Sequence, residues 1–585
     1  MWIWGSRLTF KERVRGNAAR VTAAAAAVAV FMVFAKPILL FLAKYIADTH
    51  TYLTIIFVAA VLSVYILETV ILRGKKPDPV LYGKMYLYSV TAFFAVLMIR
   101  TAWLSDDAYI SFRSAYNLIT GHGLTWNPAE RVQAFTNPLW TMIFSAFLAV
   151  NHDAYYSGLA LGMLVSTAVF YLFMRFAGSK KTGMLLAASA LIFSKAFIDF
   201  STSGLETPLS NLIFVLFFML YVSEGMSARK VFYLSLTAAA GCLNRLDASL
   251  LYVFPLLQAM TELGWARAAA PVLLGFTPLV FWEAFSLIYY GFPFPNTFYA
   301  KLNMNWSVSA FIRQGFNYLV NSLKWDPATI PLIAAGIAGA VVSGNRKLFM
   351  AAAGITAYLL YILRIGGDFM SGRFLVLPFT ASVLVLLSKD LDKYGRLRIA
   401  LAVIAALAGM SGKYSPVFSG ASCTPHHFDT GWVTDERAFY YHNSGLLRAV
   451  NYPGEMPAGR VAELGRELRS GKVSVYDRTL VYGKIGYLGY LAGPDIFIVD
   501  NFALSDAFLS KLTSKDKDLY IGHEEREIPE GYIETVETGK NAIKDPRLRE
   551  YYSHLSAIIR GPVFTKGRFN EIIAINTGKY DYLLK

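Results

Sequence analysis

The sequence predicts a multi-span α-helical membrane protein followed by a C-terminal soluble α/β or α+β domain. Of its 585 residues, 55% are hydrophobic and only 16% are charged, and the mean hydropathy is +0.43. This composition is too apolar for an ordinary soluble enzyme. Apolar runs recur as far as about residue 411, after which charged residues, Gly and Pro dominate. We therefore expect a membrane module at 1–411 and a soluble domain at 412–585.

The net charge of +15 lies in small groups of Lys and Arg between the apolar runs. A nucleic-acid-binding protein would gather such charge on one basic face. Dispersed Lys and Arg are instead typical of the cytoplasmic loops of membrane proteins. We therefore expect no nucleic-acid partner and use the charges to predict topology.

The first three apolar runs set the expected orientation. A run at 21–42 follows a basic N-terminus, a second at 52–72 ends at a basic cluster, and a third at 85–104 ends at Asp106 and Asp107. A spanning helix needs about 20 apolar residues. With both basic groups in the cytoplasm, the N-terminus lies inside and the two acids lie outside.

The run at 138–150 is too short to span a membrane, so we expect a re-entrant or interfacial segment. The runs at 231–244 and 249–262 flank Arg245 and Asp247 and are compatible with two spans or with one broken helix. We expect about 11–13 spans in total. The other expected spans are 155–176, 183–199, 208–224, 268–290, 328–344, 348–365, 373–388 and 398–411.

Because successive spans cross the membrane in opposite directions, we expect the polar motifs 203–207, 295–301 and 366–373 on the outer face, together with the C-terminal domain. That domain is expected to contain strands at 472–476, 479–481 and 495–499, and helices at 460–469 and 545–559. An ionisable residue inside a membrane helix costs about 2.5–3.5 kcal/mol, so such residues usually line an aqueous or catalytic cavity. The outer set contains the acids Asp106, Asp107, Glu206, Asp247 and Asp368 and the bases Arg113, Arg245, Lys301 and Arg373.

This mixture of acids and bases suits a reaction of an anionic donor beside a general base. A carboxylate can withdraw a proton from an acceptor hydroxyl, and Arg or Lys can hold a phosphate. Other interpretations remain open. The acidic pair alone could cap a helix, Arg245 and Asp247 could form an internal ion pair, and a polyprenyl-lipid transporter or flippase would also carry intramembrane charges.

The order of residues in the first expected outer loop indicates a protein family more specifically than the distribution of charges does. It contains Asp106-Asp107-Ala108-Tyr109-Ile110-Ser111-Phe112-Arg113, then Gly121-His122-Gly123-Leu124, Trp126-Asn127-Pro128 and Thr136-Asn137-Pro138-Leu139-Trp140. This ordered set resembles the first external loop of the polytopic GT-C glycosyltransferases, and within them the terminal arabinofuranosyltransferase AftB group. The likeness continues through 203–209, 295–301, 366–373 and Gly486, Tyr487, Asp500 and Asp506.

The resemblance implies a GT-C-type fold in a bacterial inner (plasma) membrane, with a catalytic loop at 105–137 and an extracytoplasmic C-terminal domain. It implies a glycosyltransferase (EC 2.4 class) that moves D-arabinofuranose from decaprenyl-phospho-arabinofuranose, with inversion, to a hydroxyl of cell-envelope arabinan. The alternative within this class is another lipid-linked sugar transferred to protein or lipopolysaccharide. No cofactor is required, and a divalent cation is compatible with the motifs without being demanded by them.

The resemblance also suggests roles for individual residues. Asp106 is expected to be the general base, and Asp107 is expected to orient the acceptor or share that role. Candidates for the donor phosphate are Arg113, His122, Arg245, Lys301 and Arg373, and candidates for sugar or acceptor hydroxyls are Glu206, Asp247, Asn296 and Asp368. No metal ligands are predicted.

Overall fold

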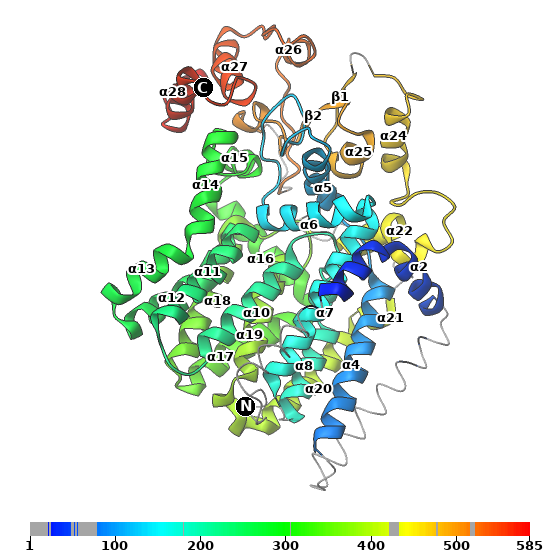
Figure 1. The fold of residues 1–585 in the computed structure, drawn as a ribbon, viewed down its shortest axis with the longest axis vertical. Helices are drawn as coiled ribbons and strands as arrows, with labels where there is room; N and C mark the ends of the chain where they lie inside the picture. Colours follow the sequence, from blue (N-terminus) through cyan, green and yellow to red (C-terminus); the bar gives the residue numbers. More distant parts are fainter. Residues whose placement is uncertain are drawn as a thin grey trace.

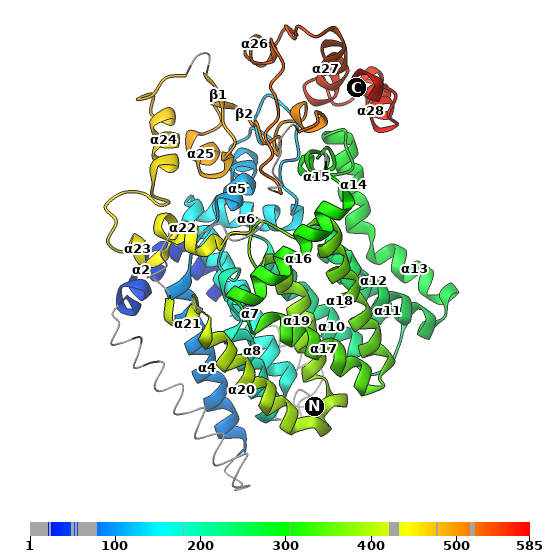
Figure 2. The same cartoon turned by 180° about the vertical axis from the view of Figure 1, so that it is seen from behind.

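The computed structural model describes residues 22, 25–47, 52, 55, 79–178, 181–304, 306–412, 414–419, 432–475, 478–514 and 521–584. Long helices lie side by side in the lower part of the molecule, and the C-terminal elements lie above them (Figure 1; Figure 2 from behind). The long helices are α4 (Pro79–Thr101), α7 (Ala154–Ala177), α8 (Lys181–Phe193), α10 (Thr207–Val222), α11 (Ala228–Asn244), α12 (Ser249–Leu263), α13 (Trp265–Gly275), α14 (Thr277–Tyr289), α16 (Val308–Trp325), α17 (Thr329–Ser343), α18 (Arg346–Ile365), α19 (Val376–Leu387) and α20 (Gly395–Ser411).

The chain is a membrane protein by composition and by its apolar helices. Within the described residues, three helices are long and apolar enough to cross a membrane: Ala154–Ala177, Arg346–Ile365 and Lys389–Ser411. Four bent helix pairs raise this number to seven if each pair is one span. The expected span at 52–72 lies outside the described residues apart from Tyr52 and Ile55. The expected total of 11–13 spans therefore stays a prediction.

Three expected spans are broken in the structure. The run at 21–42 is bent by 80° between Ala25–Val33 and α2 (Ala35–Ile46). The run at 183–199 is divided at Ser194, whose side chain accepts the Phe197 amide at the start of α9 (Lys195–Asp199). The run at 268–290 is bent by 50° between α13 and α14, where Pro278 lies in the first turn of α14 and lacks an N–H.

Other expectations match the helices more closely. The runs at 231–244 and 249–262 form two separate helices that pack against each other, so the broken-helix alternative does not hold. The short run at 138–150 is the 14-residue helix α6 (Pro138–Asn151), which lies across the long helices in Figure 1.

Helix α16 was not expected from the sequence, because polar residues such as Arg313, Gln314 and Asn321 interrupt its apolar face.

The C-terminal segment, expected to be α/β or α+β, is mainly helical and contains one short parallel pair of strands with α25 (Ile485–Ala492) between them in the chain. Strands β1 (Thr479–Val481) and β2 (Phe497–Val499) pair in parallel, with Thr479 opposite Phe497. The strand expected at 472–476 is wrong over its described residues, because the amides of Lys472 and Val473 bond to the Glu467 carbonyl at the end of α24. The α-helices of its described residues are α21 (Pro416–Ser419), α22 (Glu436–Ser444), α23 (Leu446–Ala449), α24 (Arg460–Arg469), α25 (Ile485–Ala492), α26 (Tyr532–Thr538), α27 (Pro546–Ile559) and α28 (Lys566–Asn576).

Helix α25 holds the C-terminal segment against α5 (Asp106–Ile119), the helix that carries the acidic pair. A Cβ atom at Gly486 would lie 1.9 Å from the Asp106 carbonyl oxygen, and one at Gly489 would lie 2.7 Å from the Trp126 ring. These two glycines therefore allow a close approach of two elements that a larger side chain would prevent.

Arg113, on α5, connects these same elements. It is 1% exposed and donates to the carbonyl oxygens of Trp126 (2.8 Å), Gly489 (2.5 Å) and Ile496 (2.9 Å). The expectation that Arg113 binds a phosphate is not supported, because its donors are already used by backbone acceptors. Arg113 instead joins the loop that carries Trp126 to the C-terminal segment.

Replacing Arg113 should destabilise the protein. Arg113→Met removes the donors of several buried carbonyl groups, each of which costs about 1–3 kcal/mol when it is left unpaired. We expect a clearly lower thermal unfolding midpoint in detergent or nanodiscs. The matched control is Arg460→Met, at an exposed position on α24. Equal unfolding midpoints for the two variants would contradict a bridging role for Arg113.

Candidate active site

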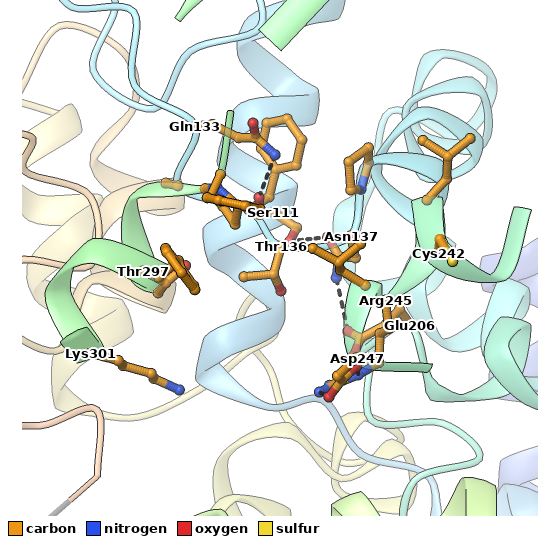
Figure 3. A pocket seen from close by; sticks show the side chains of 18 of the residues that line it. Ser111, Gln133, Thr136, Asn137, Glu206, Cys242, Arg245, Asp247, Thr297 and Lys301 are labelled. Carbon is orange, nitrogen blue, oxygen red and sulfur yellow. Dashed lines mark hydrogen bonds and ion pairs between the residues drawn. The ribbon is translucent and has the colours of Figure 1, made fainter. Parts of the chain in front are cut away.

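A cavity of about 510 Å³ lies where the long helices meet the loops and the C-terminal segment. Its walls come from α5, α12, α14, the loop at 133–138 and helix α15 (Asn296–Leu302). Figure 3 shows Lys301 reaching in from one side, with Glu206, Arg245 and Asp247 on the opposite side. The acidic, basic and histidine residues that line the cavity are Asp107, Glu206, Arg245, Asp247, Glu283, Lys301, Arg373 and His523.

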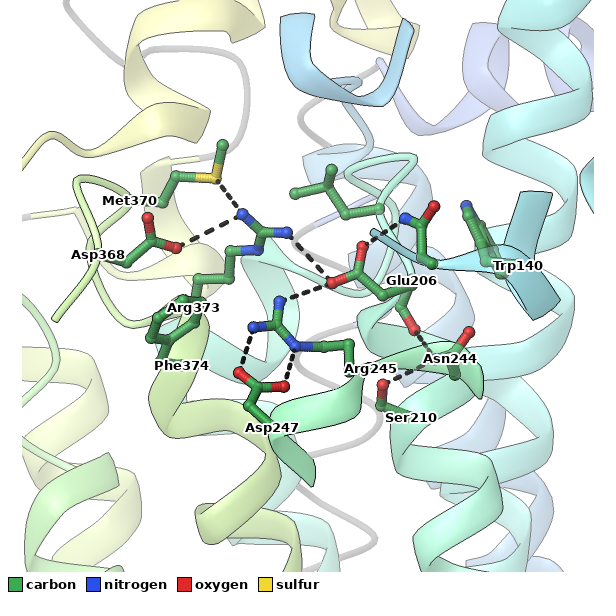
Figure 4. Close-up of polar contacts among 12 residues, drawn as sticks. Trp140, Glu206, Ser210, Asn244, Arg245, Asp247, Asp368, Met370, Arg373 and Phe374 are labelled. Atoms are coloured by element: carbon green, nitrogen blue, oxygen red, sulfur yellow. Dashed lines mark hydrogen bonds and ion pairs between the residues drawn. The ribbon is translucent and has the colours of Figure 1, made fainter. Parts of the chain in front are cut away.

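Glu206 is the centre of the charged network on one wall (Figure 4). Its side chain is fully buried and accepts from Arg245 (2.8 Å) and Arg373 (3.1 Å) through Oε1, and from Asn137 (2.9 Å) through Oε2. Although burial opposes ionisation, the two arginines hold the pKa of Glu206 at about 2. Glu206 is therefore an anion that holds two guanidinium groups at the cavity wall.

Each arginine also has a second acidic partner. Arg245 binds Asp247 through two hydrogen bonds, of 2.9 and 2.5 Å, and Arg373 lies 3.5 Å from Asp368. Asp368 is 2% exposed and does not line the cavity directly. The ion-pair interpretation of Arg245 and Asp247 is therefore correct, and both residues also face the cavity.

The two adjacent acids at the start of α5 differ in their contacts. Both carboxylate oxygens of Asp106 are used by α25: Oδ2 accepts the Gly486 amide (3.0 Å) and Oδ1 accepts the Tyr487 amide (2.8 Å). Asp107 makes no hydrogen bond or ion pair with any described residue, and it lines the cavity. The geometry therefore favours Asp107 over Asp106 as the group that meets a ligand.

The surroundings of Asp107 suit a base that works near neutral pH. Burial raises the pKa of Asp107 to about 7, even though Arg373 and Lys301 favour its ionised form. Asp106 and Asp368 add to the increase because they are like charges. A carboxylate with a raised pKa binds a transferred proton more strongly than an ordinary one.

Lys301 is the cation that faces Asp107's cavity without a partner. Among the described residues it makes no hydrogen bond or ion pair, and its side chain points into the cavity (Figure 3). Lys301 is an exposed residue, so water solvates its ammonium group where that group borders the cavity. An anionic ligand in the cavity would meet this positive charge directly.

Besides Asp106, Arg113 and Asp368, two further expected site residues do not line this cavity. His122 is exposed in the turn between Gly121 and Gly123 and contacts Thr120. Asn296 is buried and donates to three carbonyl groups of the segment 503–506, so it anchors the C-terminal segment to α15. Neither lines the cavity, because local hydrogen bonds or distant backbone partners determine their positions.

The structure adds residues that the sequence did not suggest. Trp282 and Glu283 line the cavity from α14, and His523 lines it from the C-terminal segment. An acid within the apolar run at 268–290 was a usable signal for Glu283. No local pattern indicates His523, whose position depends on long-range packing. Among the described residues, no group of three or more His, Cys, Asp or Glu side chains is arranged to hold a metal ion.

Comparison with known proteins agrees with the loop motifs. The chain is 25% identical to the terminal beta-(1->2)-arabinofuranosyltransferase of Mycobacterium tuberculosis, and the match covers 74% of this chain and 82% of that protein. It is 28% identical to the protein of the same name from Corynebacterium glutamicum, over 48% of this chain and 47% of that one. No protein-family model matches the chain. The predicted resemblance to terminal arabinofuranosyltransferases is confirmed.

Removing the charge of Glu206 should destabilise the cavity wall. Breaking a buried ion pair costs about 3–5 kcal/mol, so Glu206→Gln should clearly lower the unfolding midpoint at pH 7. The folded-state pKa of about 2 lies below the ordinary value of 4.5, so this stabilisation is present above pH 4.5 and is lost as the pH falls toward 2.

The difference between wild type and Glu206→Gln should therefore shrink across that acidic range. Glu224→Gln is the matched control, at an exposed position beyond the other end of α10. A difference that stays constant down to pH 2 would show that the charge of Glu206 is not what stabilises the wall.

Proposed function

We propose that this chain, a relative of the terminal arabinofuranosyltransferases, transfers D-arabinofuranose from decaprenyl-phospho-arabinofuranose to a hydroxyl of cell-envelope arabinan. The supporting observation is that an unpaired carboxylate, Asp107, and an unpaired cation, Lys301, face one cavity of about 510 Å³. Glycosyl transfer from a lipid phosphate needs a base for the acceptor and a cation for the departing phosphate. The two relatives named above carry the arabinofuranosyltransferase name.

Lys301 is the proposed first contact of the donor phosphate. Arg245 and Arg373 lie on the facing wall, where Glu206, Asp247 and Asp368 hold them in place. Charge on the phosphate increases as the bond from its oxygen to the sugar breaks, and the oxygen keeps the electron pair. Fixed cations stabilise that charge without having to reorganise.

Asp107 is the proposed general base. It takes the proton of the acceptor hydroxyl while the acceptor oxygen attacks the anomeric carbon on the face opposite the leaving phosphate, so that configuration inverts. Asp106 is assigned a structural role instead, because two α25 amides occupy its oxygens. Glu206 and Asp247 remain candidates for binding sugar hydroxyls from the cavity wall.

The apolar part of the cavity suits a polyprenyl donor. It is lined by Leu250 from α12, by Leu246 from the turn before that helix and by Leu279 from α14, beside the charged wall. We place the cavity on the outer side of a bacterial plasma membrane and the N-terminus in the cytoplasm, following the distribution of Lys and Arg. We further propose that transfer needs no divalent cation, because Lys301 and the two arginines supply positive charge.

Asp107→Asn should abolish transfer in membranes supplied with synthetic decaprenyl-phospho-arabinofuranose and a short arabinan acceptor. Loss of a general base lowers the rate by about 100-fold to 10,000-fold. Asp106→Asn should lose thermal stability but keep a rate close to wild type per folded molecule.

The pH dependence of kcat/KM provides a second measurement. Because the pKa of Asp107 is raised to about 7, wild-type activity should fall as the pH drops below about 7 and protonates the base. Undiminished transfer by Asp107→Asn would remove Asp107 as the base. Absence of transfer by the wild type would redirect the search to other lipid-linked sugars.

Lys301→Gln should weaken donor binding. A hydrogen bond to a charged group contributes about 1.5–3 kcal/mol, so the donor KM should rise by about 10-fold to 100-fold. Lys566→Gln, at an exposed position on α28, is the matched control. Treatment with a chelator should leave wild-type transfer intact. An unchanged donor KM in Lys301→Gln would mean that the phosphate lies elsewhere.

A further inference from the structure

A second, smaller cavity of about 50 Å³, here called the inner cavity, is also lined by Asp107 and adjoins the donor cavity. The two cavities share Asp107, Ile110, Phe369, Leu504 and His523 as lining residues. A bound water needs about 10–15 Å³ of such space, so this inner cavity has room for more than one water molecule. The residues with polar side chains that line it are Asp106, Asp107, Thr434, Glu436, Tyr440, Lys484 and His523.

Glu436, the first residue of α22, is the unexplained group in the inner cavity. It is 6% exposed, and its side chain makes no hydrogen bond or ion pair with any described residue. The neighbouring residues have clear structural partners: Asp435 binds Lys195 at 2.9 Å, and the Thr434 amide donates to the Phe369 carbonyl. An ionised carboxylate buried without a partner is costly, so this side chain is favoured in its protonated form.

Several charged groups from different elements face Glu436. Asp106 and Asp107 approach from α5, Asp368 from the loop after α18, and Lys484 from the residue before α25. Asp435 directly precedes Glu436, Tyr440 lies on α22, Tyr487 lies on α25, and His523 lines the same cavity. The charges of Asp106, Asp368 and Asp435 are balanced by amides, Arg373 and Lys195 respectively. Asp107 is therefore the unpaired acid that shares the cavity with Glu436.

Electrostatics agrees with this geometry. Burial raises the pKa of Glu436 well above its usual value, and the negative charge of Asp107 raises it further. Burial also lowers the pKa of His523 to about 4, so this imidazole is neutral at pH 7 and does not neutralise either acid.

We propose that Asp107 and Glu436 act as a coupled pair that holds one proton across the water-filled inner cavity, with Glu436 protonated and Asp107 ionised before transfer. This inference rests on the proposed function for its catalytic meaning. Glu436 is then a positioning residue: its hydroxyl donates, directly or through water, toward the inner side of Asp107. The other side of Asp107 stays free for the acceptor.

The pair also accounts for the fate of the proton. Transfer moves the acceptor proton to Asp107, so the pair then holds two protons. One of them leaves through the inner cavity, which extends to the exposed side chain of Lys484, and the original state is restored. This route remains available while sugar and lipid fill the larger cavity.

Infrared titration of the purified protein tests the pair without any assay of transfer. A protonated carboxyl group gives a carbonyl band that the ionised form lacks. Wild type should show such a band at pH 8 that is missing in Glu436→Gln. In Asp107→Asn, which keeps Glu436 but removes the neighbouring charge, the midpoint of this band should move down by about one pH unit or more.

Each outcome of this titration decides the inference. Identical bands in wild type and Glu436→Gln at pH 8 would mean that Glu436 is ionised and would overturn the proposal. An unshifted midpoint in Asp107→Asn would show that the two acids are not coupled, and would overturn it equally. The Asp107→Asn comparison uses an intact Glu436, so it remains decisive even if Glu436→Gln folds poorly.

The transfer assay separates this inference from the proposed function. If the proposed function is correct, Asp107→Asn is inactive whatever the infrared result. If the pair exists, wild-type kcat/KM should also fall at alkaline pH as Glu436 loses its proton, and Glu436→Gln should lack that decline. Glu455→Gln, at an exposed position in the C-terminal segment, is the control and should titrate like the wild type.

Discussion

The contact between the Asp106 carboxylate and the first amides of α25 is the interaction on which the candidate site depends. An anion is favoured at a helix N-terminus, where unpaired N–H groups and the helix dipole converge. Here the anion comes from a helix about 380 residues earlier in the chain. Gly486 permits the close approach, and Arg113 joins the same two elements further along. The C-terminal segment is thereby part of the site.

This constraint gives two adjacent acids different roles. Asp106 faces α25, and the next residue along the helix, Asp107, faces the cavity. The basic groups likewise divide into paired and unpaired residues. Arg245 and Arg373 are neutralised by Glu206 and its neighbours, whereas Lys301 has no hydrogen-bond or ion-pair partner among the described residues. A buried charge is tolerated when it is paired, so the partly buried and unpaired Asp107 marks where a ligand would supply the missing interaction, and the exposed Lys301 borders the same cavity.

The sequence predicted much of the helical framework, because long apolar runs dictate membrane helices directly. Thr479–Val481 and Arg460–Arg469 were also predicted with their observed bounds. The errors of the prediction from sequence came from helix breaks that depend on single residues, such as Ser194 in the run at 183–199. The false strand at 472–475 arose because a β-like composition there serves instead to end α24.

For the site, the sequence by itself determined which side chains were available and that most of them would gather on one face. Glu206, Arg245, Asp247, Lys301 and Arg373 do so, because membrane helices admit charges mainly where they line a polar cavity. Only the tertiary structure decided which of these charges have partners. These partners come from distant parts of the chain: α25 contacts Asp106, and Glu436 lines a cavity with Asp107. No local sequence pattern predicts such contacts.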